Sequence, residues 1–175
     1  MGATCCFTGH RKTDSRSVSY DDTPASKPGL AEALRSCAEE LYEKHGVRTF
    51  ITGMALGTDL LAAQVVLEMI EKSPDIKLIG AIPCADQSAR WTEAARRRYD
   101  AVRKKLDNSC VFQDTYSRDC MDKRNRFMVD NAEYVIAVWN GSKGGTFQTI
   151  KYARKQRRGI FFINPETLEI KRENM

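Results

Sequence analysis

Two glycine-rich segments of the sequence contain the residue types that bind phosphate groups. GMALGTD at residues 53–59 and GGT at residues 144–146 each lie between a short apolar run and an amphipathic stretch. Glycine leaves backbone N–H groups accessible to an anion, and a helix start adds the positive end of its dipole. Neither segment matches the phosphate-binding loop ending in G-K-S/T or the G-x-G-x-x-G dinucleotide fingerprint. The residues expected to take part in an anion site are Gly53, Gly57, Thr58, Gly144, Gly145 and Thr146.

An arginine and an aspartate accompany these turns. Thr8-Gly9-His10-Arg11 follows the first apolar run of the chain. Gly9 allows a ligand to approach closely, and the planar guanidinium of Arg11 pairs with phosphate or carboxylate groups. Asp59 is able to cap the following helix, to hold a neighbouring loop or to accept a hydrogen bond from a ribose hydroxyl. Capping is the most common of these roles for an aspartate at a helix start.

Four further residues are candidates for the same site. Gln87 and Trp91 follow the third apolar run and are expected in the next helix, where Trp91 either stacks on a base or packs in the core. Arg124 and Asn125 lie in the helix before the fifth strand. They approach a ligand from the side if that helix begins at the same crevice; otherwise they belong to a solvated basic face.

The elements that must position these residues follow from periodicity. Apolar runs rich in β-branched and aromatic residues alternate five times with amphipathic stretches. Strands are expected at residues 3–8, 48–52, 77–83, 109–113, 134–139 and 159–164, and helices at 28–44, 58–72, 89–107, 118–131 and 146–157. This alternation predicts an α/β fold in which helices cover both faces of a mainly parallel sheet.

Ligands of such sheets bind beyond the carboxyl ends of the strands. The backbone N–H groups around Gly57 and Gly145 and the guanidinium of Arg11 are therefore expected to converge on one hollow at that edge. The polar stretch at residues 12–27 is expected to form a loop or lid over the end of the first strand.

Composition indicates one globular domain, residues 1–175. Hydrophobic residues make up 42% and charged residues 29%, and no run approaches the roughly 20 apolar residues of a membrane span. The six cysteines form no C-x-x-C pair and there are two histidines, which disfavours a metal site. The cysteines lie in or beside apolar runs and no signal-peptide core follows Met1, so a reducing, cytoplasmic location is expected.

Charge is unevenly distributed along the chain. The net charges of residues 1–89, 90–126 and 127–175 are −3, +5 and +3. A basic second half favours a phosphate-bearing partner, either a nucleotide or a nucleic acid. Solvated helix faces explain the same distribution equally well.

The motifs taken together resemble a known family. They are TGHR at residues 8–11, GMALGTD at 53–59, the spaced Pro83, Gln87 and Trp91, RNRFMVD at 124–130 and GGTxxTIxYA at 144–153. In order and spacing they are similar to the YpsA/YoqJ family of the SLOG superfamily, whose members share a Rossmann-like, three-layer fold with DprA and the LOG phosphoribohydrolases. The resemblance implies a glycine-lined pocket for a nucleotide or a nucleotide-derived, ADP-ribose-like ligand.

Three functions remain open on this resemblance. The first is non-catalytic binding or sensing of a phosphorylated small molecule, with no cofactor, no metal and no membrane partner; a homo-oligomer is compatible with it. The second is LOG-type cleavage of an N-glycosidic bond. The LOG loop resembles PGGxGTxxE, but no acidic residue occurs here between Thr146 and Arg158. The chemistry requires a carboxylate, so Asp59 or a residue of the expected lid such as Asp14 would have to supply it. The third is DprA-type binding of single-stranded nucleic acid in a basic groove. The first function is favoured.

Overall fold

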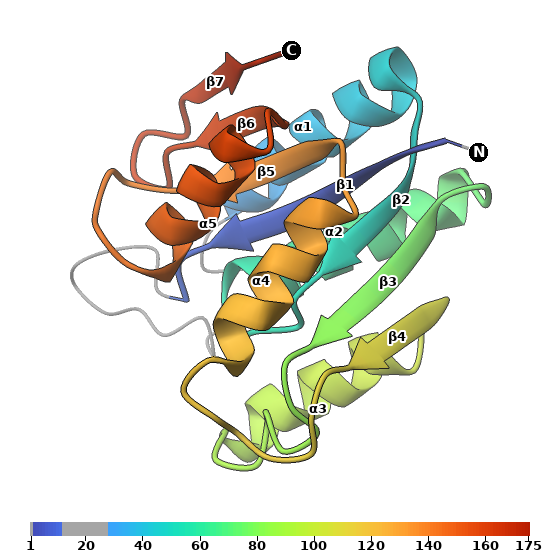
Figure 1. Cartoon of the computed structure of the whole chain (residues 1–175). Coiled ribbons are helices and arrows are strands. Elements are labelled where there is room, and N and C mark those ends of the chain that lie inside the picture. Colours follow the sequence, from blue (N-terminus) through green and yellow to red (C-terminus); the bar gives the residue numbers. More distant parts are fainter. Residues whose placement is uncertain (1, 12–27) are drawn as a thin grey trace.

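The structure is a computed structural model that describes residues 2–11 and 28–175 (Figure 1). The stretch expected to form a loop or lid, residues 12–27, lies outside the described residues. The strands are β1 (Ala3–Gly9), β2 (Val47–Thr52), β3 (Lys77–Ile82), β4 (Asn108–Val111), β5 (Tyr134–Val138), β6 (Gly159–Ile163) and β7 (Ile170–Glu173). The helices are α1 (Pro28–His45), α2 (Thr58–Lys72), α3 (Glu93–Arg103), α4 (Cys120–Asp130) and α5 (Gly145–Lys155).

The strands form one sheet in the order β4-β3-β2-β1-β5-β6-β7. All neighbouring pairs are parallel except β6 and β7. β1 lies at the centre, where Cys5 pairs with Phe50 of β2 on one side and Tyr134 of β5 on the other. The chain first builds outward from β1 to β4 and then returns to the other side of β1. This reversal of strand order beside β1 is where open α/β sheets bind their ligands.

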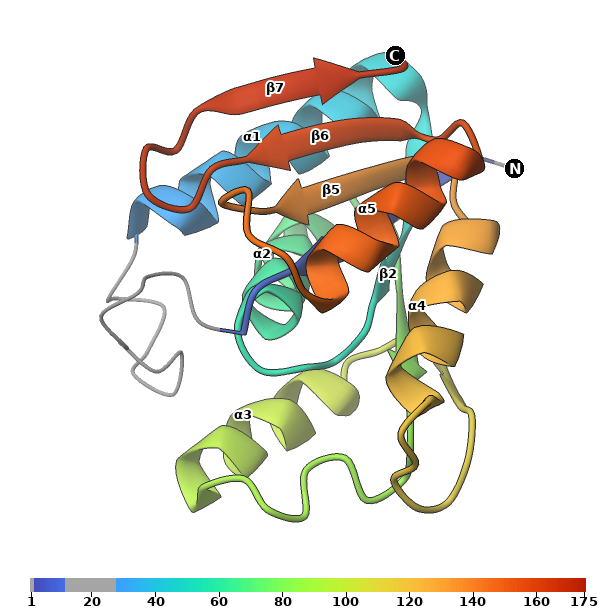
Figure 2. The same ribbon diagram turned by 60° about the vertical axis from the view of Figure 1, so that its left-hand side comes forward.

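Two hydrophobic cores lie on the two faces of the sheet. One face is covered by α1, α2 and α3 and the other by α4 and α5 (Figures 1 and 2). The first core contains Leu34 of α1, Val66 of α2 and Tyr99 of α3, whereas the second contains Val129 of α4 and Ile150 of α5. The α/β class, the mainly parallel sheet and the three-layer Rossmann-like arrangement predicted from periodicity and resemblance are therefore confirmed.

Two elements differ from the sequence-based expectation. The third helix begins at Glu93 rather than at residue 89, because the Thr92 side chain accepts a hydrogen bond from the N–H of Ala95 at 3.2 Å and caps it there. Trp91 consequently precedes the helix. The prediction also lacked β7, whose sequence IKRE has one apolar residue. This strand pairs antiparallel to β6, with Ile163 opposite Ile170.

No helix formed by the described residues is long and apolar enough to cross a bilayer.

Candidate ligand-binding site

A pocket of about 260 Å³ lies beyond the carboxyl ends of β1 and β2, between α4 and the start of α5. Side chains or backbone from four segments of the chain meet there. The lining consists of Phe7, Thr8, Gly9, His10, Arg11, Ala55, Asp59, Met121, Arg124, Asn125, Met128, Gly145 and Thr146. Of the residues proposed from sequence, Gly53, Gly57, Thr58, Gln87, Trp91 and Gly144 are outside this lining.

The start of α5 faces this pocket with open backbone. The first hydrogen bond of the helix runs from the N–H of Gln148 to the carbonyl of Gly144 at 3.0 Å, so the N–H groups of Gly145 and Thr146 precede it. A Cβ added at Gly144 or Gly145 would meet nothing within 4 Å among the described residues. These two N–H groups lie at the positive end of the α5 dipole, where an anion is favoured.

The start of α2 is occupied by the protein's own chain. The N–H and the hydroxyl of Thr58 donate to the carbonyl of His10, at 3.4 and 3.0 Å. Gly57 has a φ of 85°, and a Cβ there would lie 2.6 Å from the carbonyl oxygen of Arg11. Thr58 also fills the space beside Gly9, where its Cβ would be 2.6 Å from an added Cβ.

Of the three groups expected to converge on one hollow, two lie at the same pocket. Gly145 and Arg11 line one pocket, but the backbone near Gly57 packs against residues 10–11 instead of facing that pocket. The glycines at positions 9 and 57 allow close approach of one loop to another. A glycine-rich helix start alone does not distinguish this packing from a ligand cradle.

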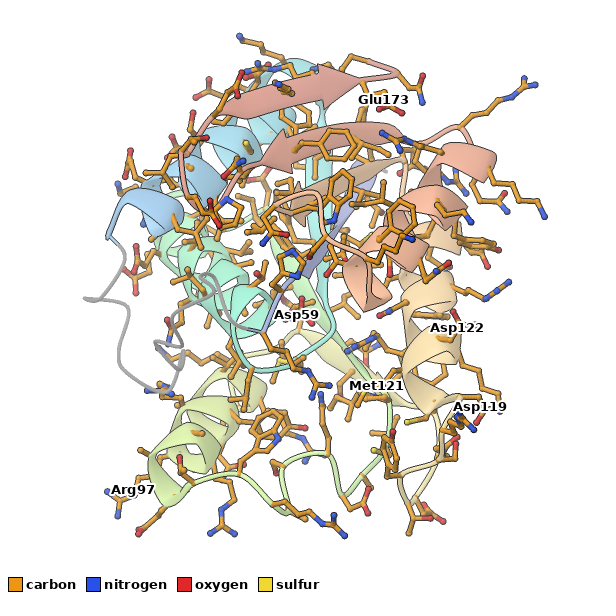
Figure 3. The ribbon with its side chains drawn as sticks, turned by 90° about the vertical axis from the view of Figure 1, so that its left-hand side faces the viewer. Asp59, Arg97, Asp119, Met121, Asp122 and Glu173 are labelled. Atoms are coloured by element: carbon orange, nitrogen blue, oxygen red, sulfur yellow. The ribbon has the colours of Figure 1, made fainter. Side chains whose placement is uncertain are left out.

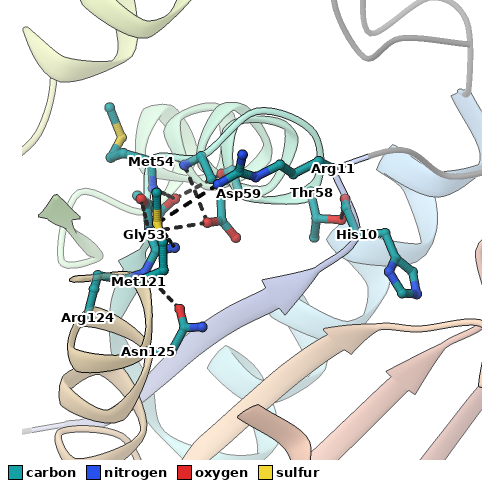
Figure 4. Close-up of polar contacts among 11 residues, drawn as sticks. His10, Arg11, Gly53, Met54, Thr58, Asp59, Met121, Arg124 and Asn125 are labelled. Atoms are coloured by element: carbon teal, nitrogen blue, oxygen red, sulfur yellow. Dashed lines mark hydrogen bonds and ion pairs between the residues drawn. The ribbon is translucent and has the colours of Figure 1, made fainter. Parts of the chain in front are cut away.

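Arg124 joins α4 to the turn after β2 (Figure 4). Its Nη1 donates to the carbonyl of Gly53 and lies 3.8 Å from Oδ2 of Asp59, while its Nε donates to Oδ1 of Asn125 at 2.8 Å. Arg124 is 5% exposed and Asp59 is 6% exposed. The structure thus brings Asp59, Arg124 and Asn125 together, and Arg124 is not part of a solvated basic face.

Burial opposes the charge on both members of this pair. It raises the pKa of the Asp59 carboxyl, against the opposing effects of Arg124, the Ala55 N–H and Arg11. It also lowers the pKa of Arg124, against the attraction of Asp59. The N–H of Ala55 donates to Oδ2 of Asp59 at 3.4 Å, a long hydrogen bond. Asp59 is therefore a weakly partnered, pocket-lining carboxylate that can accept hydrogen bonds from hydroxyl groups.

His10 connects the turn after β1 to the turn after β5. Its Nε2 accepts a hydrogen bond from the N–H of Asn140 at 3.4 Å, which requires the neutral ring. Burial lowers the pKa of His10, against the opposing effect of Asn140. The hydrogen bond from Asn140 and the burial of the ring both favour the neutral imidazole, and the other basic side chains of the pocket lining are those of Arg11 and Arg124.

A second compartment, of about 390 Å³, adjoins the first. Arg11 and Met121 line both, and Nη2 of Arg11 donates to the Met121 sulfur at 3.9 Å. The other residues that line the second compartment are Cys84, Asp86, Gln87, Ala89, Arg90, Trp91 and Tyr116. Gln87 and Trp91, which sequence reasoning placed at the common site, belong to this neighbouring compartment. In Figure 3, Asp59 and Met121 lie toward the middle of the view, whereas Arg97 lies at its periphery.

Sequence reasoning missed the methionines of the site. Met121 and Met128 of α4 line the pocket beside Arg124 and Asn125. A signal was present, because Met121, Asn125 and Met128 are spaced by four and three residues and therefore share one helix face. Methionine is a common gap-filling residue of cores, so this spacing does not by itself indicate a ligand site.

Comparisons with known proteins agree with this architecture. A family model described as the YspA SLOG family matches residues 5–168. The SPbeta prophage-derived protein YoqJ of Bacillus subtilis strain 168 is 33% identical over 151 residues, which is 78% of this chain and 88% of YoqJ.

Two solved structures share the fold. DNA processing protein A (DprA) of Streptococcus pneumoniae gives a TM-score of 0.64 at 18% identity, covering 96% of this chain and 52% of DprA. The Helicobacter pylori protein of the same name, described with a single-stranded DNA binding mode, gives 0.60 at 19% identity, covering 96% of this chain and 68% of that protein. This chain thus spans about half the length of the pneumococcal protein.

Proposed function

The chain belongs to the YspA SLOG family, and from that premise we propose that it binds a nucleotide or nucleotide-derived phosphorylated small molecule at the carboxyl edge of its sheet. One observation carries the proposal. The open start of α5, the carboxylate of Asp59 and the guanidinium of Arg11 line a single pocket. A phosphate group fits the start of α5 and the guanidinium of Arg11, and the hydroxyls of a ribose fit the carboxylate of Asp59.

The ligand's phosphate is assigned to the space between Arg11 and the N–H groups of Gly145 and Thr146. Arg11 is exposed, and its one hydrogen bond among the described residues is the long contact with Met121. Its guanidinium therefore gives up little when it turns to an anion. Arg124, in contrast, is held by Gly53, Asp59 and Asn125, so its charge contributes through the field rather than by direct contact.

Binding without catalysis fits the pocket better than hydrolysis. Asp59 is the one carboxylate among the residues that line it. N-glycosidic cleavage of the LOG type requires a carboxylate free to act on the ribose side. The proposal already uses Asp59 to accept hydrogen bonds from the ribose hydroxyls, and the described residues of the lining include no second carboxylate to act on the glycosidic bond. Slow release of free base from a nucleoside monophosphate, abolished in Asp59→Asn, would contradict the non-catalytic assignment.

The test is ligand-induced thermal stabilisation with AMP, ADP, NAD, ADP-ribose, orthophosphate and pyrophosphate. A ligand at 100 times its Kd stabilises by about 2.7 kcal/mol, or roughly 5–10 °C for a chain of this size. Arg11→Ala and Gly145→Asp are expected to abolish that shift. Gly145→Asp introduces a negative charge into the cradle while remaining compatible with a helix start, which favours acidic residues.

Matched controls carry the same changes away from the pocket. Arg97→Ala removes an exposed arginine of α3, and Ala94→Asp adds an acid to the exposed first turn of that helix. Both are expected to keep the full shift. The proposal is overturned if no compound in the panel stabilises the wild-type protein, or if Arg11→Ala and Gly145→Asp respond as the controls do.

A second candidate, binding of single-stranded nucleic acid, is favoured by one surface. The exposed face of α3 carries Arg96, Arg97 and Arg103, and Lys104 follows it. The shared fold with the DprA proteins adds to this candidate. Affinity for an oligonucleotide that falls steeply with salt, and that weakens in Arg96→Ala/Arg97→Ala but not in Gly145→Asp, would support it. Equal affinity of both variants would exclude this surface.

A further inference from the structure

The second compartment contains a buried amide without a partner. Neither Nε2 nor Oε1 of Gln87 has a hydrogen-bond partner among the described residues, and both atoms are buried. The hydroxyl of Tyr99 is in the same condition. An unpaired buried amide costs the desolvation energy of both its donor and its acceptor, so it is rarely kept without a reason.

Gln87 lines the second compartment, and Tyr99 packs against Trp91, which lines it too. Three of the four buried side-chain polar atoms that lack a partner in the described part of the chain belong to Gln87 and Tyr99. The ring of Tyr99 meets Trp91 edge to face, with centroids 5.4 Å apart, and Trp91 lines the compartment with Gln87. The compartment wall therefore combines an aromatic surface with hydrogen-bonding capacity that the protein itself does not use.

An exposed aromatic ring lies at the same compartment. Tyr116 is 62% exposed, more than any other large hydrophobic side chain among the described residues. Exposed aromatic side chains at the wall of a pocket are typical of sites that stack on flat ligands. Trp91 and Tyr116 thus offer two aromatic surfaces to a planar group.

The compartment adjoins the proposed phosphate site. Arg11 and Met121 line both spaces, so a ligand that extends from one to the other passes the exposed Arg11 guanidinium. The two volumes, about 260 and 390 Å³, together fall within the range of roughly 300–1,000 Å³ of small-molecule sites. A molecule with a phosphate in the middle and a flat heterocycle at one end matches this layout.

We propose that the second compartment binds the nucleobase, with its plane against Trp91 and Tyr116 and its edge read by the Gln87 amide. This inference rests on the proposed function. The amide presents a donor and an acceptor side by side, and the edge of a base presents a complementary pair. A rotation of the Gln87 side chain toward the compartment brings the amide to the base and satisfies both atoms.

In this proposal, the Gln87 amide determines which nucleobase edges the compartment binds. Adenine offers an amino donor beside a ring-nitrogen acceptor, which pairs with a donor and an acceptor. Gln87→Glu replaces this pair with two acceptors. The carboxylate is complementary to the two adjacent donors of guanine, N1–H and the amino group, and not to the adenine edge. The substitution is therefore expected to shift base preference in a direction that a merely structural role does not produce.

Calorimetric titration with ADP, GDP and pyrophosphate tests the proposal. Wild-type protein is expected to bind ADP at least about tenfold more tightly than pyrophosphate. Gln87→Leu is expected to weaken ADP binding about tenfold, which corresponds to roughly 1.4 kcal/mol, without changing pyrophosphate binding. Gln87→Glu is expected to move the ADP-to-GDP affinity ratio about tenfold toward GDP. Gln148→Leu, at an exposed position outside both compartments, is the matched control and is expected to change none of these values.

Two further measurements keep the test independent of folding defects. Gln87→Leu removes an unpaired buried amide, so the free variant is expected to melt no lower than the wild type. The chain has two tryptophans, so Trp139→Phe leaves Trp91 as the sole one. The fluorescence of Trp91 in that variant is expected to be quenched by ADP but not by pyrophosphate.

The outcomes separate this proposal from the one it rests on. If ADP and pyrophosphate bind equally, Gln87→Leu is silent and Trp91 fluorescence does not change, the base site is wrong while phosphate binding stands. If none of the three ligands binds, both proposals fail. A preference for ADP that is insensitive to Gln87 but lost in Trp91→Ala would also overturn the role given to the amide.

Discussion

The turns after β2 and β5 have similar sequences and different surroundings. Both contain glycines and a threonine at a strand-to-helix junction: GMALGTD has two glycines and GSKGGT has three. The turn after β2 is closely packed at both of its glycines: Arg124 and Asp59 fill the space beside Gly53, and residues 10–11 fill the space beside Gly57. Around the turn after β5, no atom of the described residues lies within 4 Å of a Cβ placed at Gly144 or Gly145.

The difference shows what glycine indicates in such a turn. Glycine marks a place where another group approaches the backbone closely. It does not indicate whether that group belongs to the protein or to a ligand. At the β2 turn the group belongs to another loop, and the rigid turn holds Asp59 at the pocket wall. At the β5 turn, the described residues leave the space beside Gly144 and Gly145 open. The first turn thus supports the proposed site, and the second is the phosphate cradle that we propose.

The largest expected effect on the free energy of unfolding comes from a substitution in the turn after β2. Gly53→Ala places a Cβ 2.5 Å from Oδ2 of Asp59 and 2.6 Å from Cζ of Arg124, so the buried ion pair must separate. Disrupting such a pair costs roughly 3–5 kcal/mol. Gly145→Ala, which meets no described atom, is expected to change the free energy of unfolding by less than about 1 kcal/mol. Urea unfolding of both variants measures the contrast.

Similar stability of these two variants would contradict the distinction between the turns. The control is Gly46→Ala, at a positive φ of 68° with open space around it. It isolates the backbone cost of an alanine in the left-handed region, roughly 1–2 kcal/mol, from the steric cost at Gly53.

Local sequence patterns predict most of the strands and helices, but they do not predict the tertiary contacts that hold the turn after β2. Six of the seven strands and all five helices follow from apolar periodicity, because that signal is carried by neighbouring residues. β7 was missed because its pairing depends on the free edge of β6 rather than on its own sequence, which has Ile170 as its sole apolar residue. The start of α3 was misplaced because Ala89 and Trp91 fit a helical pattern, and the Thr92 cap decides the boundary.

The candidate site likewise contains residues that the sequence predicts and contacts that it does not. Arg11, Asp59 and Gly145 could be predicted because each follows a strand that ends at the ligand edge. The burial of Arg124 could not, because an arginine within a basic run carries no sign of a distant carboxylate partner. The occupation of the α2 start by His10 likewise depends on how two loops meet. Such contacts are tertiary, and one sequence does not encode them in any local pattern.

The second prediction concerns pH and the ion pair that supports the site. Burial raises the pKa of Asp59 in the folded protein, so the unfolded chain loses this proton first as pH rises. The contribution of Asp59 to stability is therefore greatest at acid pH and falls from about pH 4 up to the raised pKa. Relative to Asp59→Asn, the wild type is expected to lose about 1.4 kcal/mol for each unit by which that pKa is raised.

Denaturant unfolding of both proteins at intervals between pH 4 and pH 7 checks this, since the difference cancels the other titrating groups. A difference that grows in favour of the wild type with rising pH would mean that attraction to Arg124 outweighs burial. The turn after β2 would then be stabilised by its charge pair rather than by packing.

The third prediction sharpens the role of the open turn. Thr146 is 7% exposed and lines the pocket, whereas Thr149, one turn later, donates its hydroxyl to the carbonyl of Gly145 at 3.0 Å and lies outside that lining. Thr146→Val removes a hydroxyl beside the proposed phosphate and is expected to weaken nucleotide binding about 5- to 10-fold. Thr149→Val is expected to leave binding unchanged. Calorimetry with ADP compares them, and equal losses would place the effect in the helix rather than in the pocket.

The smallest expected effect tests the link between the two turns. The carbonyl of His10 accepts a hydrogen bond from the hydroxyl of Thr58 in the first turn. Its ring Nε2 accepts one from the N–H of Asn140 in the second turn. Because burial lowers the pKa of His10, the unfolded chain takes up the proton first, and stability falls as pH drops below about 6.5. His10→Gln retains the carbonyl and removes the titration, so it is expected to lose less stability than the wild type between pH 7 and pH 5. The difference should stay under about 1 kcal/mol, because the half-exposed ring is screened by water. Identical acid profiles by urea unfolding would mean that the two turns are not coupled through this side chain.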